Sequence, residues 1–525
     1  IHHILTAHEQ GASHAADGYA RSTGKVGVCF ATSGPGATNL TTGIATAYMD
    51  SSPVVFITCN VTEETLGKDA FQEVDITGIA MPITKATYLV RDPKTIPDVM
   101  RQAFAVAATG RPGPVLIDFL KNVTAPSVEI DYEFIPWTQN RETNSIRQLA
   151  VSHGLKAPEP DQSDVDKLVE MIAQSERPLL ICGGGVVRGR ADKQFREFAE
   201  KLDAPVAITV MGGGGFPGAH PLTTGMIGMH GSQASNVACN ECDLLIAVGC
   251  RFSDRVALQP DTFASPAKLV HIDIDRSEID KNVLTDHHII GSAKRVLELL
   301  NERLPQYHHQ SWKEHILPLR EPQVVEEGDK LTPGQILDAI EKAVPRDAIV
   351  ATDVGQHQMW SIQHFHFNYP GQLLTSGGFG TMGFGLGAAI GAKIGNPDKV
   401  VVHTTGDGCF RMNCHELATV EHYHLPIITV VFNNGTLGMV RQWQHLIYHE
   451  HYSQTTLDRG PDFVKLAEAY GLKGKRVTNR AEMEQALQEA LSCGCGYVID
   501  CQVDMDEMVR PMVAGGAHIT DFLLK

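Results

Sequence analysis

The chain has 525 residues, which is more than one hydrophobic core usually supports, so several domains are expected. With 43% hydrophobic and 20% charged residues, its composition is that of an ordinary globular protein. The formal net charge of −17 argues against binding nucleic acid or an anionic membrane through overall charge. No apolar run reaches the roughly 18 residues of a transmembrane helix.

The chain begins at Ile1 without an initiator Met or a signal-peptide pattern, so a processed or truncated product is expected. Its eleven cysteines are irregularly spaced, which disfavours a disulfide scaffold. We interpret Cys239-Asn-Glu-Cys242 and Cys493-Gly-Cys495 as buried core thiols, because no second pair follows at zinc-site spacing. Reduced thiols indicate a cytoplasmic protein, or an organellar one if a targeting segment was removed.

The first stretch, residues 1–125, contains apolar strands at 26–31 and 53–58. Between them lie a Gly-rich turn, Ser33-Gly34-Pro35-Gly36, and a helix that runs through Ala47. Strands that alternate with helices predict βαβ units and a parallel sheet. Residues 126–163 are rich in Pro, Glu, Asp, Ser and Gln without periodicity, which predicts a linker.

Two further α/β stretches follow, at 164–305 and 332–505, separated by a polar segment at 306–331. We interpret Tyr307-His308-His309-Gln310 in this segment as solvated linker residues. The predicted strands are 178–182, 243–248 and 269–274 in the second stretch, and 348–352, 400–404 and 427–432 in the third. A helix of small residues is predicted at 383–395, and residues 506–525 form a tail. The fold class is therefore α/β, with three domains of parallel sheets flanked by helices.

Two Gly- and Asn-rich turns come directly after predicted strands of the third stretch. They are Gly406-Asp407-Gly408 and Asn433-Asn434, and Asn434 comes 27 positions after Asp407. Ligands bind at the carboxyl edge of an open parallel sheet, and carboxylate and amide oxygens suit Mg²⁺. Each turn alone could be a plain turn signal, but together they predict a Mg²⁺-diphosphate site. Gly378-Phe-Gly380-Thr-Met-Gly383 also matches G-x-G-x-x-G, which is a weak signal by itself.

This spacing resembles that of thiamine-diphosphate enzymes, and further segments resemble the catalytic subunits of acetohydroxyacid (acetolactate) synthases. The resemblance covers essentially the whole chain in register. Its segments are His8-Glu9-Gln10-Gly11-Ala12, Ala31 to Asn39, Asp69-Ala-Phe-Gln-Glu73, Arg111-Pro-Gly-Pro114, Gly228-Met-His-Gly231, Arg251-Phe-Ser-Asp-Arg255, Val354 to Trp360 and Gly438-Met-Val-Arg-Gln-Trp443.

The resemblance implies that Glu9 activates the cofactor by hydrogen-bonding its aminopyrimidine ring, so that the thiazolium C2 loses its proton. A Glu does this best when burial raises its pKa. The alternative is a carboxylate that only stabilises a helix start. Gln72, Phe71 and Lys85 also match active-site positions.

The resemblance also implies three ligand-binding sets. Mg²⁺ would be held by Asp407, Asn434 and the carbonyl of Thr436. Arg255 would bind the carboxylate of the second 2-oxoacid, and Trp443 would contact the alkyl tail of that substrate. Thiamine diphosphate would contact Gln356, His357, Gly380, Met382, Asp407, Gly408, Asn434, Leu437, Gly438 and Met439. Structural FAD would contact Arg111, Gly184, Thr209, Val210, Gly228, Met229, His230, Gly249, Arg251, Asp273 and Ile274.

The chain departs from the family pattern at several positions. Ser253 and Ser292 stand where Asp is usual, which weakens the FAD assignment, and Ala7 replaces a basic residue. Gly387 replaces a Pro, which we expect to loosen that turn, and Ala514 replaces a Pro in the tail. The family's opening helix, first strand and a Gly-rich loop have no counterpart before Ile1, so an incomplete or inactive form is considered.

The implied activity is decarboxylation of pyruvate on thiamine diphosphate and condensation of the hydroxyethyl enamine with pyruvate or 2-oxobutyrate. The products, 2-acetolactate and 2-aceto-2-hydroxybutyrate, lead to branched-chain amino acids.

The implied assembly is a homodimer or homotetramer with active sites between subunits, plus a small regulatory subunit. The alternatives are another thiamine-diphosphate enzyme, such as a pyruvate oxidase, an oxalyl-CoA decarboxylase or a glyoxylate carboligase, and a noncatalytic cofactor-binding scaffold. Glyoxylate carboligases lack the activating Glu, so Glu9 argues against that one.

Overall fold

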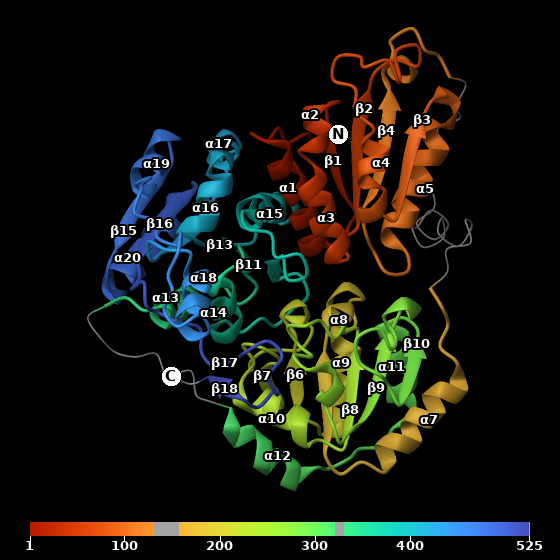
Figure 1. Cartoon of the computed structure of the whole chain (residues 1–525), viewed down its shortest axis with the longest axis vertical. Coiled ribbons are helices and arrows are strands. Elements are labelled where there is room, and N and C mark those ends of the chain that lie inside the picture. The colour runs from red at the N-terminus through yellow and green to blue at the C-terminus, as the bar shows by residue number, and fades with distance from the viewer. Residues whose placement is uncertain (131–156, 321–329, 524–525) are drawn as a thin grey trace.

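The computed structural model describes residues 1–130, 157–320 and 330–523 (Figure 1). Three wholly parallel sheets, of four, six and six strands, lie one in each predicted stretch, and helices flank them. The predicted α/β class is thus confirmed. Most strands are buried along nearly their whole length, as strands covered on both faces by helices must be.

The N-terminal sheet has the strand order β1-β2-β4-β3. Its strands are β1 (Gly27–Ala31), β2 (Val54–Asn60), β3 (Ala86–Val90) and β4 (Val115–Leu120). Its main helices are α1 (Glu9–Thr23), α2 (Pro35–Thr38), α3 (Thr41–Met49), α4 (Ile76–Ala80) and α5 (Ile96–Ala108). Both predicted strands are present to within two residues.

The central sheet has the strand order β10-β9-β8-β5-β6-β7, so the order reverses between β5 and β8. Ligands bind at such a switch point in open α/β sheets. The strands are β5 (Pro178–Cys182), β6 (Val206–Ile208), β7 (Thr223–Met226), β8 (Leu244–Val248), β9 (Lys268–Asp273) and β10 (His287–Ile290). The helices are α7 (Gln162–Ala173), α8 (Gly184–Arg188), α9 (Asp192–Leu202), α10 (Gln233–Glu241) and α11 (Ala293–Arg303).

The C-terminal sheet has the strand order β12-β11-β13-β14-β16-β15, with its switch point between β11 and β13. The strands are β11 (Ile349–Thr352), β12 (Leu373–Thr375), β13 (Val401–Gly406), β14 (Ile427–Asn433), β15 (Lys473–Val477) and β16 (Tyr497–Gln502). The helices are α13 (Pro333–Ala343), α14 (Gln356–His364), α15 (Phe384–Gly395), α16 (Asp407–Asn413), α17 (Leu417–His422), α18 (Gly438–Leu446), α19 (Phe463–Ala469) and α20 (Arg480–Cys493).

Helices α1 and α15 pack closely and join the N-terminal and C-terminal domains (Figure 1). Glycines permit the approach, because a Cβ on Gly391 would lie 1.8 Å from the Ala15 carbonyl oxygen. A Cβ on Gly18 would lie 2.2 Å from the Ala388 carbonyl oxygen. Gly387 belongs to the same contact, because a Cβ there would lie 2.7 Å from the Cβ of His14. Gly387 is thus a buried position of α15.

Two sequence interpretations are wrong. Within the proposed linker 306–331, as far as residue 320, helix α12 (Gln310–Ile316) docks on the central domain. The indole of the buried Trp312 donates to the Pro178 carbonyl at 3.0 Å, and His309 Nδ1 lies 2.7 Å from the Leu202 carbonyl. One short helix with two buried apolar side chains was too small a periodic signal to find. In the other proposed linker, residues 131–156 lie outside the described residues.

The second wrong interpretation concerns the thiols. Cys239 and Cys242 are fully buried, as expected. Cys493 and Cys495 are instead half-buried at the end of α20, with their sulfur atoms 3.0 Å apart. All eleven cysteines are free.

The described part of the chain contains no helix with the length and apolarity needed to cross a membrane.

The tail forms a small antiparallel pair, β17 (Met512–Val513) and β18 (Phe522–Leu523), which packs against the central domain (Figure 1). Val513 N donates to the Met229 carbonyl at 2.7 Å, and Gly516 N donates to the Leu258 carbonyl at 3.2 Å. The tail therefore links the C-terminal sheet to the loops of the central one.

Candidate functional site

The two predicted turns meet at the carboxyl edge of the C-terminal sheet, because β13 and β14 pair with Gly406 opposite Phe432. Asp407 is the first residue of α16 and is buried. Its Oδ1 accepts a hydrogen bond from Gly408 N at 3.0 Å, whereas its Oδ2 is buried without a partner. Burial raises the pKa of Asp407 to about 6, although the N–H groups of Gly408 and Gly435 act in the opposite direction.

This geometry fits a divalent cation. A buried carboxylate oxygen without a partner is costly unless a ligand satisfies it. The neighbouring Asn434 offers an amide oxygen whose one contact is a long, 3.3 Å hydrogen bond from Thr436 N. Among the described residues no three His, Cys, Asp or Glu side chains gather at metal-ligand spacing. A hard cation here would therefore take its other ligands from main-chain carbonyls, phosphate and water, as Mg²⁺ does.

Glycines leave room beside this edge. A Cβ on Gly408 would lie 2.7 Å from Leu437 Cδ2 and 3.8 Å from Met382 Cε, so these three residues meet. A Cβ on Gly438 would lie 1.9 Å from the amide oxygen of Gln356. Gly380 has φ +74°, a left-handed conformation that favours glycine.

The first turn of α14, directly after the loop that follows β11, carries two other predicted thiamine-diphosphate contacts, Gln356 and His357. Gln356 Nε2 donates to Gln442 Oε1 at 3.0 Å and to the Glu507 carbonyl at 2.8 Å, which ties this loop to α18 and the tail. His357 Nε2 is buried without a partner, and burial lowers the pKa of His357 to about 4. The imidazole is therefore neutral near pH 7. The structure thus gathers the predicted thiamine-diphosphate positions around the loops that follow β11, β12, β13 and β14.

A cleft of about 1760 Å³ runs from this edge across the central domain. It crosses the switch point of the central sheet, where Gly184 follows β5 and Gly249 follows β8. Ten of the eleven predicted FAD positions line it: Arg111, Gly184, Thr209, Val210, Met229, His230, Gly249, Arg251, Asp273 and Ile274. Gly228 does not line the cleft; it has φ +108°, and a Cβ there would lie 2.1 Å from the Arg255 carbonyl.

The cleft fits a dinucleotide in size and lining. His230 Nε2 is buried without a partner, and burial, followed by Arg255, lowers the pKa of His230 to about 4. Arg111 is not free, since its Nη1 pairs with Glu278 at 2.6 Å and with Asp275 at 3.2 Å. Ser253 and Ser292 both line the cleft, so the two departures from the family pattern do not close it.

The two predicted substrate residues meet at this cleft. The Arg255 guanidinium carbon lies 5.9 Å from the centre of the Trp443 ring, and the Arg255 side chain is 59% exposed. Arg255 Nη1 also lies 3.7 Å from Met229 Sδ. Gly380 and Met439 line the same cleft. A guanidinium and an indole ring thus stand beside residues predicted to hold the cofactor.

The predicted catalytic residues of the N-terminal domain do not line this cleft. Phe71 is 88% exposed, and Gln72 has φ +63°. Lys85 Nζ turns onto the carbonyls of Val106 and Thr109, at 2.5 and 2.6 Å, and its desolvation lowers the pKa of Lys85 to about 8. Within this chain the Lys85 ammonium therefore caps the C-terminal end of α5.

Glu9 is half-buried, and its Oε2 accepts a hydrogen bond from Asn39 Nδ2 at 3.0 Å. It is also the first residue of α1, the position of a helix-start carboxylate.

Sequence reasoning missed several charged residues of the cleft: Arg188, Lys281, Lys294 and Arg295. Arg188 is the last residue of the short helix α8, which follows the predicted strand 178–182, so a basic residue shortly after the glycines at the end of that strand was an available signal. Lys281 comes from the segment after β9, and Lys294 and Arg295 come from the first turn of α11; no local pattern marks them.

Three family models match the chain. They are the N-terminal binding domain (residues 1–79), the central domain (165–300) and the C-terminal binding domain (353–501) of thiamine pyrophosphate (thiamine diphosphate) enzymes. The chain is 45% identical to a probable acetolactate synthase large subunit of Methanocaldococcus jannaschii, over 99% of this chain and 88% of that protein. It is 42% identical to the acetolactate synthase isozyme 2 large subunit of Escherichia coli, over 100% and 93%. The acetolactate synthase of Arthrospira platensis is 45% identical, over 100% and 90%. The chain therefore belongs to the acetolactate synthase large-subunit family of thiamine-diphosphate enzymes.

Proposed function

We propose that this chain decarboxylates pyruvate and joins the two-carbon fragment to a second 2-oxoacid, with thiamine diphosphate, Mg²⁺ and FAD bound. The observation that carries the proposal is the buried, unpartnered Asp407 Oδ2 beside the loops of Gly408, Asn434 and Met382. Bound thiamine diphosphate would supply the carbon nucleophile and the electron sink. The products would be 2-acetolactate from pyruvate and 2-aceto-2-hydroxybutyrate from 2-oxobutyrate.

The residues of the C-terminal domain would bind and orient. Asp407, Asn434 and the Thr436 carbonyl would ligate Mg²⁺, which neutralises the diphosphate charge. The Gly438 backbone and the Gln356 amide would pack beside the cofactor, held by the hydrogen bonds of Gln356 to Gln442 and Glu507. Met382 would support the cofactor ring as an apolar contact.

Arg255 and Trp443 would select the second substrate. The exposed guanidinium of Arg255 can bind a carboxylate through two hydrogen bonds. Trp443 would contact the alkyl tail, where one extra methyl group is worth roughly 1–3 kcal/mol. FAD in the cleft would have a structural role, because the net reaction is redox-neutral.

Glu9 would hold a proton at the aminopyrimidine nitrogen of the cofactor bound by a second copy of the chain. Two observations support an active site between subunits: Glu9 is only half-buried, and it does not line the cleft. We therefore propose a homodimer or homotetramer, and a small regulatory subunit as the "large subunit" relatives suggest.

The test is acetolactate formation from pyruvate, with thiamine diphosphate, Mg²⁺ and FAD supplied. Glu9→Gln should lose most of the activity and still bind Mg²⁺ and thiamine diphosphate. The control is Glu64→Gln, which removes an exposed carboxylate of the same domain. Absence of product from a chain that binds both cofactors would contradict the proposal. Full activity in Glu9→Gln would contradict the role of Glu9.

A further inference from the structure

A buried ionic network joins the N-terminal domain to the loop between β12 and α15, which carries Gly380 and Met382. Arg21 is at its centre, with a side chain only 1% exposed. Its Nε and Nη2 donate to the two carboxylate oxygens of Asp17, both at 2.7 Å, and Nη2 also lies 3.1 Å from Asp50 Oδ2. Its Nη1 donates to the Thr375 carbonyl, at the end of β12, at 2.6 Å. One guanidinium thus connects α1, the end of α3 and the beginning of the loop.

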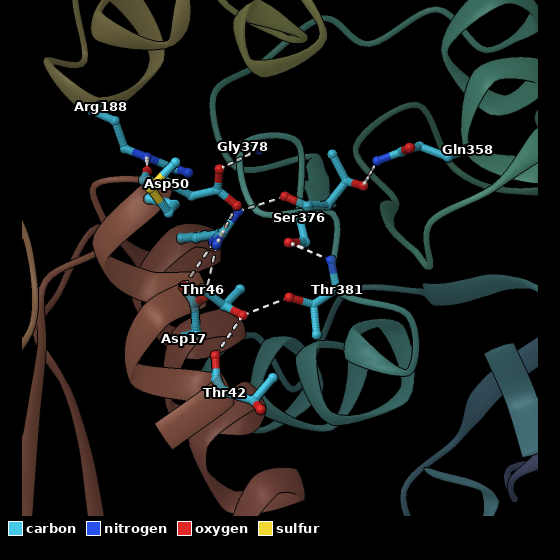
Figure 2. Close-up of polar contacts among 12 residues, drawn as sticks. Asp17, Thr42, Thr46, Asp50, Arg188, Gln358, Ser376, Gly378 and Thr381 are labelled. Carbon is cyan, nitrogen blue, oxygen red and sulfur yellow. Dashed lines mark hydrogen bonds and ion pairs between the residues drawn. The ribbon is translucent and has the colours of Figure 1, made fainter. Parts of the chain in front are cut away.

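Asp50 holds the middle of the loop. Its Oδ1 accepts a hydrogen bond from Gly378 N at 2.7 Å, while its Oδ2 faces Arg21 (Figure 2). Its own carbonyl accepts from Arg188 Nε at 3.3 Å. A carboxylate fixed on both oxygens can hold a backbone N–H in one place, because charge-assisted hydrogen bonds are the stronger kind.

Thr46 on α3 holds the end of the loop, where Thr381 stands between Gly380 and Met382. The two hydroxyl oxygens are 2.7 Å apart (Figure 2). Thr46 has one hydroxyl proton and donates it to the Thr42 carbonyl at 2.8 Å, so Thr381 must be the donor to Thr46. Thr381 N also donates to Ser376 Oγ at 3.0 Å. Both threonines are buried, so neither hydroxyl can exchange its partner for bulk water.

The loop needs such restraint. It contains Gly377, Gly378 and Gly380, and glycine loses more conformational freedom on ordering than any other residue. The loop is tightly packed at Gly378, because a Cβ there would lie 2.6 Å from Asp50 Oδ1 and 2.7 Å from Arg251 Nη2. Gln358 Nε2 secures the start of the loop by donating to Thr375 Oγ1 at 2.6 Å.

We propose that Thr46, Asp50 and Arg21 are positioning residues that hold the loop 376–382 in the conformation that receives thiamine diphosphate. None of the three needs to touch the cofactor. They act through Gly378 and Thr381, which flank Gly380, and through Met382 next to Thr381. The inference rests on the proposed function, because it assigns that loop to the thiamine-diphosphate site. It also means that the N-terminal domain of a chain fixes the loop 376–382 at the diphosphate site of the same chain.

The test uses Thr46→Val, which keeps the volume of the side chain but removes the acceptor for Thr381. Amide hydrogen exchange of Gly380 and Thr381, measured in the full chain without cofactor, should become about tenfold faster. Amides of the central strand β13 should not change. The dissociation constant of thiamine diphosphate with Mg²⁺, measured by calorimetry, should rise about tenfold. Thr46→Ser keeps the hydroxyl and should restore both values.

The matched control is Thr41→Val on the same helix, because the Thr41 hydroxyl bonds the Thr38 carbonyl and not the loop. Thr381→Val should reproduce the effect from the other side, and the double variant Thr46→Val/Thr381→Val should cost less than the sum of the two. Unchanged loop exchange and cofactor affinity in Thr46→Val would overturn the inference, as would additive single effects. A wild-type chain that binds no thiamine diphosphate would instead contradict the proposed function, and loop exchange would still decide the role of Thr46.

Discussion

Arg21→Met should strongly destabilise the protein, because Arg21 is the one cation that contacts both Asp17 and Asp50 in the described network. The Asp17 and Asp50 side chains are 1% and 0% exposed, and each lies within 3.1 Å of the guanidinium. Removal of one partner from a buried pair leaves the other charge uncompensated, at a cost of roughly 3–5 kcal/mol. In Arg21→Met both carboxylates lose this cation and the Thr375 carbonyl loses its donor, whereas Asp50 Oδ1 keeps its hydrogen bond from Gly378 N, so a loss within that range is expected.

The pH dependence gives a second, independent signature. Burial acts to raise the pKa of Asp17, but its contacts with Arg21, together with the smaller effects of Ser52 and Arg188, outweigh burial and the pKa lies below its ordinary value. This group therefore contributes stability above its unfolded pKa, and the contribution is lost as pH falls through the lower folded pKa. In Arg21→Met burial is no longer opposed by Arg21, so protonation relieves the buried charge. The stability difference between wild type and variant should therefore shrink as pH falls, because the variant gains stability by protonating a carboxylate that wild type keeps ionised.

The assay is pulse proteolysis across a urea series, with fragments of the N-terminal domain identified by mass, so that the free energy of unfolding refers to that domain. Arg196→Met is the control, since Arg196 and Glu200 form an exposed pair of which about 0–1 kcal/mol is expected. Arg21→Met/Asp17→Leu should be more stable than Arg21→Met, because one unpaired charge is gone. A loss in Arg21→Met no larger than in Arg196→Met would refute the reasoning.

Three further outcomes are expected. Gly391→Ala places a Cβ 1.8 Å from the Ala15 carbonyl oxygen and should lower the free energy of unfolding by about 3 kcal/mol or more, measured by denaturation; unchanged stability would refute the close contact of α1 with α15. Asp407→Asn should weaken Mg²⁺-dependent binding of thiamine diphosphate in calorimetry by at least about tenfold, and equal affinity would exclude Asp407 as a metal ligand. Trp443→Leu should reduce the preference for 2-oxobutyrate over pyruvate by roughly 10-fold in product ratios, and an unaltered ratio would remove Trp443 from the tail pocket.

The sequence by itself determined the parts that depend on local pattern. Short apolar runs followed by Gly-rich turns predicted strands such as 178–182, which the structure reproduces without a shift. The carboxyl ends of parallel strands share one edge, so Asp407 and Asn434 could be placed together before any coordinates were known. The resemblance implied eleven FAD contacts from separate segments, and ten of these positions line one cleft.

Only the tertiary structure decided the features that depend on contacts between distant segments. The network of Arg21 joins residue 17 to residue 375, and no periodicity connects them. Trp312 docks on Pro178 although its surroundings are polar, and Glu9 is half-buried because its burial depends on neighbours outside its helix. Local pattern reports the average environment of an element, whereas burial, partner choice and close approach follow from how whole domains pack. Asp407 could thus be identified from sequence, but the contacts that hold the loop beside it could not.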